Sequence, residues 1–124
     1  MQSEATPRRT VLLRHTLPDG TWHFDWMVDR DGVGPLVTFR VQDRPDSADI
    51  SAFAAQRIGD HRRVYLDFEG DVSGGRGRVE RVAAGVVERL SEGADFEVVV
   101  RFGGVVKQWR GRHMGGDRWE FQAF

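Results

Sequence analysis

Residues 96–110, FEVVVRFGGVVKQWR, decide the fold class of this chain. Two segments rich in valine and aromatic residues, 96–102 and 105–110, are separated by the pair Gly103-Gly104. β-Branched and aromatic residues favour strands, and a two-glycine connection permits the positive φ angles of a tight hairpin turn. The stretch therefore predicts two neighbouring antiparallel strands.

Similar short apolar segments recur along the rest of the chain, separated by turn residues. They predict further strands at 11–15, 22–28, 36–41, 63–69, 77–83, 85–90 and 119–121. A short helix is predicted at 48–56, capped by Ser47 or Asp49. No helical crossovers lie between the strands, which argues against a parallel α/β sheet. The expected fold is all-β and mainly antiparallel: a compact closed or partly closed β-barrel of about eight short strands with one or two short helices.

The length fits one domain. The chain has 124 residues and a mass of 14.1 kDa, which leaves no room for a second independent core. Residues 1–9 are polar and are predicted to be a flexible terminus, followed by a single domain at 10–124. No apolar run reaches the roughly 18 residues of a membrane span, and no signal-peptide pattern is visible. We therefore expect a cytoplasmic protein that does not enter a membrane.

Composition and missing motifs exclude several function classes. The 18 basic and 19 acidic residues give a net charge of -1, which excludes a uniformly basic nucleic-acid coat but not a local basic patch. The absence of cysteine excludes disulfide scaffolds, thiol nucleophiles and cysteine-ligated zinc. No serine-hydrolase elbow and no glycine-rich dinucleotide fingerprint are present.

A first candidate site contains two histidines and one carboxylate. His23 and Asp25 are two residues apart on a predicted strand, so their side chains project from the same face. The turn at 16–20 could fold His15 back beside His23. Two imidazoles and a carboxylate suit a divalent ion such as Mn²⁺, Fe²⁺ or Zn²⁺. The alternative is a surface or hydrogen-bonded His-Asp pair without a metal.

A second candidate site is a phosphate contact. In an extended chain His61, Arg63 and Tyr65 share one face, and together they offer a histidine, a positive charge and a phenol to phosphate oxygens. The alternative is an edge strand with polar side chains in solvent. The glycine-rich segment 73–77 lacks the spacing of a P-loop and is interpreted as a flexible turn, from which Arg76 and Arg78 add positive potential.

In their order, these motifs resemble the 3′-phosphoesterase domain of bacterial DNA ligase D, and more closely its short free-standing relatives. The first family block places a histidine on one strand and His-aromatic-Asp on the next, here His15 and residues 23–25. The second block is Asp-His-x-x-x-Tyr, here residues 60–65, followed by Phe-Glu-Gly at 68–70 and the glycine-rich turn. The resemblance extends from about Val11 to the C-terminus.

The resemblance implies both a site and an activity. It implies a β-barrel in which His15, His23 and Asp25 hold Mn²⁺, while His61 and Tyr65 contact the phosphate. The implied reaction trims DNA or RNA–DNA 3′ ends in end repair, by removing a terminal ribonucleoside and hydrolysing the remaining 3′-phosphate. A DNA ligase or polymerase is the implied protein partner.

The chain departs from the family pattern in several places, one of which affects the phosphate contact. The family carries a phosphate-binding arginine two residues after the aspartate, where this chain has Met27, and Arg40 or Arg63 are the candidates to replace it. Two other functions therefore stand beside the enzyme. One is a weak or inactive barrel that binds nucleic-acid ends or a ligase or polymerase partner. The other is a metal-binding barrel that acts on a different phosphorylated small molecule.

Overall fold

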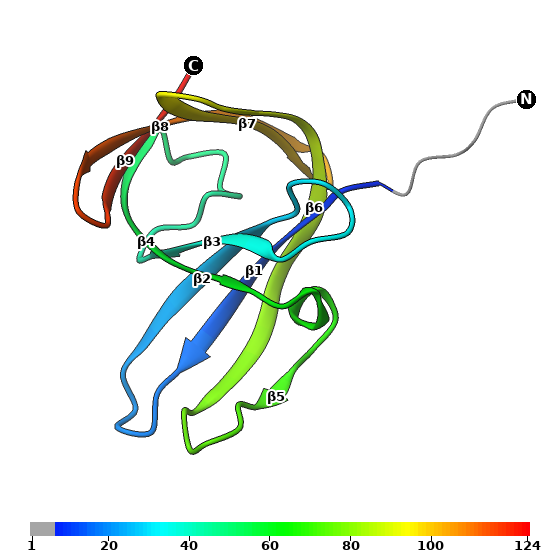
Figure 1. The fold of residues 1–124 in the computed structure, drawn as a ribbon, viewed down its shortest axis with the longest axis vertical. Coiled ribbons are helices and arrows are strands. Elements are labelled where there is room, and N and C mark those ends of the chain that lie inside the picture. Colours follow the sequence, from blue (N-terminus) through cyan, green and yellow to red (C-terminus); the bar gives the residue numbers. More distant parts are fainter. Residues whose placement is uncertain (1–6) are drawn as a thin grey trace, which may run out of the picture.

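The computed structural model describes residues 7–124, most of which lie in antiparallel strands (Figure 1). The strands are β1 (Arg9–Thr16), β2 (Trp22–Val28), β3 (Leu36–Val41), β4 (Ala52–His61), β5 (Gly70–Asp71), β6 (Arg78–Glu92), β7 (Asp95–Phe102), β8 (Val105–Gly115) and β9 (Arg118–Ala123). One 3₁₀ helix, η1 (Arg63–Leu66), follows β4 within this part of the chain. These elements confirm the predicted all-β, mainly antiparallel class.

Eight of the strands formed by residues 7–124 close into a ring. The order of hydrogen-bonded neighbours is β1-β2-β3-β4-β9-β8-β7-β6, and β6 also pairs with β1. The two-residue strand β5 adds to β6 outside the ring. The predicted hairpin at 96–110 is confirmed as β7 and β8, with Phe102 opposite Val105. The expectation of a closed or partly closed β-barrel therefore agrees with the structure.

Aromatic side chains fill the interior of the ring. Trp26, Trp109 and Phe121 have no exposed surface, and the rings of Phe53 and Phe121 stack with centroids 5.0 Å apart. Residues 42–51, which connect β3 to β4, run into the space that the ring encloses (Figure 1). There the Trp109 Nε1–H donates to the Pro45 carbonyl at 3.1 Å. The packed side chains leave little room for a ligand inside the ring.

A second, smaller core lies on the outer face. Val11 and Leu13 of β1 and Met27 of β2 pack there against Leu66 and Val72 of the segment that connects β4 to β6. The same strands thus bury one face in the ring and the other beneath this segment. Coverage of both faces of β1 explains why three consecutive residues, Val11 to Leu13, are apolar.

Three local predictions were wrong. The expected helix at 48–56 is absent, and β4 occupies most of that range with Phe53 and Ala55 buried between exposed neighbours. This alternation has the period of a strand, and pairing with β3 and β9 overrides the helical propensity of the alanines. The expected strand at 63–69 is instead the helix η1 and a following turn. The strands predicted at 77–83 and 85–90 are one long strand, β6.

The start of the chain joins the ring earlier than predicted. Of the expected flexible terminus at 1–9, residues 1–6 lie outside the described part. Arg9 already pairs with Val86 in β6, and the Val87 N–H donates to the Arg8 carbonyl at 2.8 Å. In the described part of the chain, no helix combines the length and the apolar character that crossing a membrane requires.

Candidate metal centre

The structure brings His15, His23 and Asp25 together on the outer face of β1 and β2. His15 and His23 are register partners across the β1–β2 hairpin, and Asp25 lies one pleat further along β2. His23 and Asp25 are buried, with 4% and 3% of their surface exposed, and His15 is partly buried. One donor atom from each side chain lies within 4.8 Å of the others. This group could bind a metal ion.

The donor atoms are arranged for a shared ligand. His23 Nε2 lies 3.1 Å from Asp25 Oδ1, yet both atoms are buried and neither has a hydrogen-bond partner. Unpaired buried polar atoms are costly, so these two atoms are suited to binding a common ligand. Donors about 2.1 Å from a common ion are about 3.0–3.4 Å apart in octahedral or tetrahedral geometry. The His23–Asp25 separation fits that range, and the distance of 3.6 Å between His15 Nδ1 and Asp25 Oδ2 lies just outside it.

The tautomer of His15 is set by a backbone contact. His15 Nε2 lies 2.7 Å from the Arg76 carbonyl oxygen, which can only accept, so this nitrogen carries the proton and donates. The other ring nitrogen, Nδ1, is then unprotonated in the neutral imidazole and lies 3.6 Å from Asp25 Oδ2. Metal-binding histidines generally donate their second ring N–H in this way. His15 therefore presents a free lone pair to the cluster.

Gly77 allows the Arg76 carbonyl to reach His15. A Cβ at Gly77 would lie 2.0 Å from the Thr16 carbonyl oxygen, and the backbone here has φ +92°. Only glycine tolerates both conditions. The Arg76 guanidinium holds the other end of the turn, because its Nε donates to the Ser73 carbonyl at 2.7 Å. The glycine-rich segment thus orients His15, one of the candidate metal ligands.

Substituting Gly77 with alanine should weaken metal binding. The added methyl group must push the turn away from β1, which removes the hydrogen bond that orients His15. We expect Mn²⁺ affinity, measured by isothermal titration, to fall by about tenfold, as for other contacts that orient metal ligands. Gly75→Ala is the matched control, because φ is also positive there but no atom lies within 4 Å of the added Cβ. Equal losses in both variants would contradict this role.

A small cavity opens beside the cluster. It has a volume of about 70 Å³ and is lined by His15, Asp25, Met27, His61, Tyr65, Val72, Arg76 and Val79. His61 and Tyr65 meet edge to face in it, with ring centroids 5.5 Å apart. His61 Nδ1 donates to the Gly59 carbonyl at 2.8 Å, so Nε2 is free to exchange a proton or a hydrogen bond. Two of the three residues predicted to contact phosphate therefore line the same cavity as two of the predicted metal ligands.

Arg63, the third predicted phosphate contact, does not line the cavity. Its guanidinium forms two bonds to the Asp29 carboxylate, at 2.8 and 3.0 Å, and a third to the Gly34 carbonyl. The side chains of His61, Arg63 and Tyr65 do not share a strand face, because the strand ends at His61. Arg63 instead fastens η1 to the turn that follows β2, and so holds Tyr65 in place.

The Asp29 carboxylate is fully buried and accepts hydrogen bonds from Arg63 and from the backbone N–H groups of Asp31 and Gly32. Burial opposes its ionisation, but hydrogen bonds from Arg63 and from the Gly32 backbone outweigh this and hold the pKa of Asp29 below its usual range. A lowered folded-state pKa adds stability above the unfolded-state value of about 3.9. That stability is lost as the pH falls through the folded-state pKa.

Asp29→Asn should therefore destabilise the protein in a pH-dependent way. We expect a loss of about 2–4 kcal/mol in the free energy of unfolding at about pH 7, because Arg63 loses its partner. The difference from wild type should shrink as the pH falls below about 3.9. Urea unfolding at several pH values measures both effects. Asp67→Asn, which breaks an exposed pair with Arg9, is the control and should cost much less. A pH-independent loss would contradict the ion-pair explanation.

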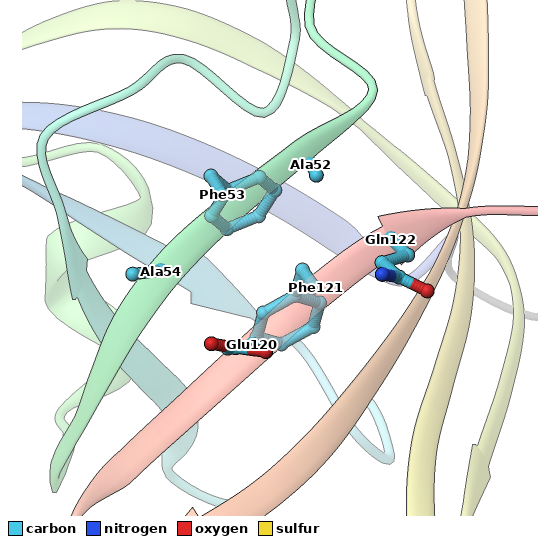
Figure 2. A pocket seen from close by; sticks show the side chains of 6 residues that line it. All are labelled: Ala52, Phe53, Ala54, Glu120, Phe121 and Gln122. Atoms are coloured by element: carbon cyan, nitrogen blue, oxygen red, sulfur yellow. The ribbon is translucent and has the colours of Figure 1, made fainter.

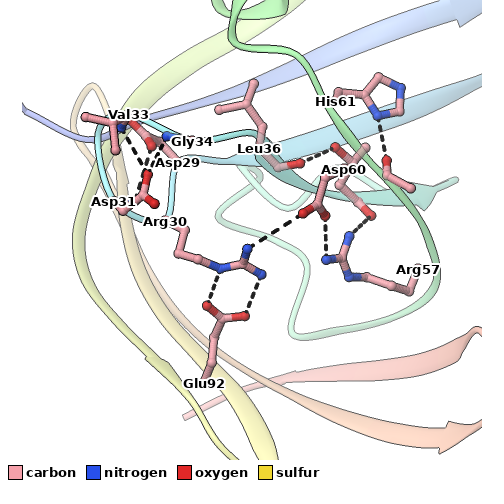
Figure 3. Close-up of polar contacts among 12 residues, drawn as sticks. Asp29, Arg30, Asp31, Val33, Gly34, Leu36, Arg57, Asp60, His61 and Glu92 are labelled. Carbon is pink, nitrogen blue, oxygen red and sulfur yellow. Dashed lines mark hydrogen bonds and ion pairs between the residues drawn. The ribbon is translucent and has the colours of Figure 1, made fainter.

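Ion pairs also fix the end of β4, where His61 lies (Figure 3). Asp60 accepts from Arg57 at 2.7 Å and lies 3.6 Å from Arg30, which in turn bonds Glu92 at the end of β6. Figure 3 shows these residues joining the turn after β2 to the ends of β4 and β6. Each partly exposed pair contributes little alone, but together they restrict the position of His61.

Arg40 remains available near the metal cluster. It lies on β3 directly opposite Asp25 of β2, so both side chains project from the outer face. Its Nε is buried without a hydrogen-bond partner, and among residues 7–124 no carboxylate pairs with it. Of the two arginines considered as replacements at the Met27 position, Arg40 is the one that is free.

Two groups that support the candidate site were not predicted from the sequence. The Arg76 backbone carbonyl orients His15, and no side-chain pattern signals a backbone contact over 61 residues. Glu69, part of the Phe-Glu-Gly motif, accepts from the Arg81 N–H at 3.0 Å, beside the irregularity where β6 shifts register against β1. Its role is structural, because it caps a strand N–H beneath the outer segment.

Comparison with protein-family models gives no match, and comparison with curated proteins gives none either.

Proposed function

We propose that this protein is a Mn²⁺-dependent 3′-phosphoesterase that trims or dephosphorylates DNA or RNA–DNA 3′ ends in DNA end repair. One observation carries the proposal: His15 and Asp25, two members of a His₂Asp cluster with unpaired buried donor atoms, line a small cavity together with His61 and Tyr65. Metal ligands, a free imidazole nitrogen and a phenol in one cavity are the groups that phosphate-ester hydrolysis requires.

The donor set fits a divalent ion of the Mn²⁺ type. Two imidazole nitrogens and one carboxylate would hold the ion and leave further positions for water and substrate. When bound, such an ion lowers the pKa of a coordinated water and neutralises charge on a phosphate oxygen. The protein's part is to fix the ligands, which the Arg76 carbonyl does for His15.

The remaining cavity residues act on the phosphate. The Tyr65 hydroxyl can donate a hydrogen bond to a phosphate oxygen. His61, with Nδ1 donating to Gly59, can bind a second oxygen through Nε2 or pass a proton to the leaving alkoxide. Arg40, which lies opposite Asp25 but does not line this cavity, would supply from beside it the positive charge that the family arginine gives at the Met27 position.

The size of the cavity favours action at a strand end. Its volume of about 70 Å³ corresponds to about two water molecules. Sites that enclose a whole small molecule are usually about 300–1,000 Å³. A terminal phosphate group can enter such a cavity while the attached nucleoside stays outside.

A second candidate function is supported by two residues. Met27 contributes an apolar side chain to the cavity at the position where the family carries an arginine. Arg63 forms an ion pair with Asp29 and does not line the cavity. Fewer positive groups around the phosphate favour a barrel that binds nucleic-acid ends, or a ligase or polymerase partner, without turnover.

Phosphate release from matched oligonucleotides tests the proposal. One strand ends in a 3′-phosphate and the other, of the same sequence, in a 5′-phosphate. We expect Mn²⁺-dependent release from the 3′-phosphate strand alone. Binding of both strands without release would favour the second function. Release from a phosphorylated small molecule in preference to either strand would favour a different phosphatase.

A further inference from the structure

A straight row of polar side chains leads away from the metal centre across the outer face. Asp25 of β2 pairs with Arg40 of β3, Arg40 pairs with Gln56 of β4, and Gln56 pairs with Arg118 of β9. Directly opposed residues in antiparallel strands project to the same face. The row Asp25–Arg40–Gln56–Arg118 therefore crosses four neighbouring strands and begins at a metal ligand.

The two arginines of this row are not neutralised. Within the described range 7–124, neither Arg40 nor Arg118 forms an ion pair, whereas Arg101 of β7 pairs with Glu88 and Arg110 of β8 with Glu97. Two acidic groups lie nearby. Asp117 accepts a hydrogen bond from the Gln56 amide at 2.7 Å, and Glu120 lies opposite Arg112. The row therefore places a guanidinium group that forms no ion pair on each side of the Gln56 side chain.

Shallow hollows accompany the row. Ala52 and Ala54 are the exposed residues of β4 beside Gln56, and each presents only a methyl group (Figure 2). Hollows of about 300, 180 and 230 Å³ meet at Ala54. Arg40 and Gln56 line one of them and Arg118 lines another. The surface is therefore concave beside Arg40 and Arg118.

We propose that the strand that carries the reactive 3′ end lies along the row Arg40–Gln56–Arg118, with its phosphates toward the arginines and its 3′ end at the metal centre. This inference rests on the proposed function and makes it more specific, because it assigns the surface along which the polynucleotide substrate lies.

The dimensions agree with a short length of single strand. Neighbouring strands are about 4.8 Å apart, so the row from Asp25 to Arg118 spans about 14 Å. A stacked nucleic-acid strand advances about 3.4 Å per phosphate, so the row matches about four nucleotides. Free guanidinium groups along a groove are typical of surfaces that follow a phosphate backbone. A small phosphorylated substrate would not use Arg118, three strands away from the metal ligand.

Charge reversal at the far end of the row tests the inference. Arg118→Glu is compared with Arg89→Glu, which changes the net charge equally on β6, on another side of the ring, where Arg89 also has no ion pair within residues 7–124. Two measurements are made with Mn²⁺. One is the ratio of kcat/KM for a 3′-phosphorylated oligonucleotide to that for a nucleoside 3′-monophosphate, and the other is oligonucleotide binding by fluorescence anisotropy.

We expect Arg118→Glu to lower the kcat/KM ratio and the oligonucleotide affinity by about tenfold, and to reduce the salt dependence of binding. Arg89→Glu should leave both near wild type. Equal effects of the two variants, or no effect of Arg118→Glu on binding, would overturn the path. Absence of turnover in wild type would instead refute the proposed enzymatic activity. The anisotropy measurement alone would then test whether the nucleic-acid strand binds along the row. A wild-type protein that binds no oligonucleotide would overturn both.

Discussion

Asp25→Asn lowers the Mn²⁺-dependent rate by at least about a thousandfold, if the buried cluster is the catalytic metal site. The amide keeps the shape of the side chain but loses the negative charge that a divalent ion requires. Because Asp25 Oδ1 has no hydrogen-bond partner, the substitution breaks no hydrogen bond of that atom, and the fold should be retained. Phosphate release, a Mn²⁺ titration and circular dichroism measure the three effects.

His23→Ala should behave in the same way, because it removes a second ligand with little loss of folding. Asp49→Asn, at an exposed carboxylate in the connection between β3 and β4, is the matched control and should leave rate and metal binding near wild type. If either ligand variant turns over normally, the assignment of the metal site is wrong.

His61→Ala should separate catalysis from metal binding. His61 lines the cavity but does not belong to the His15–His23–Asp25 cluster. We expect the rate to fall by about a hundredfold to ten-thousandfold, as for other groups that transfer a proton or bind a reacting oxygen. Mn²⁺ affinity should change by less than about twofold, because no ligand is lost.

His113→Ala is the control for this variant, since His113 lies on β8 and bonds the Gly116 carbonyl at the β8–β9 turn. Tyr65→Phe should have a smaller effect than His61→Ala, because it removes a hydrogen bond but no proton transfer. Loss of Mn²⁺ binding in His61→Ala would show that His61 is a metal ligand rather than a phosphate contact.

The fold was predictable where the deciding signals are local. The hairpin predicted at 96–110 is confirmed. Its signals, Gly103-Gly104 and the flanking valines, all lie within the hairpin itself. The helix predicted at 48–56 failed for the opposite reason. Ala52 and Ala54 have high helical propensity, but pairing with β3 and β9 places this segment in the ring. Such tertiary pairing is not visible in a single segment.

The candidate site was likewise predictable where local sequence patterns determine it. His23 and Asp25 share a face through strand periodicity, and the short turn brings His15 to them, as the structure confirms. His61 and Tyr65 do share a cavity, although through the η1 turn rather than a strand. The ion pair between Arg63 and Asp29 joins residues that are 34 positions apart, so no local sequence pattern could predict this pair. The identity of the ion as Mn²⁺ stays a prediction.

The most direct test of the central claim is a gel assay with a labelled primer–template that ends in a 3′-phosphate. Wild type and His23→Ala are compared with and without Mn²⁺, and a primer with a terminal 3′-ribonucleotide is included. We predict Mn²⁺-dependent conversion to a 3′-hydroxyl end by wild type and none by His23→Ala. Conversion by both proteins, or no conversion by wild type with any of several divalent metals, would contradict the assignment of this site as a 3′-phosphoesterase centre.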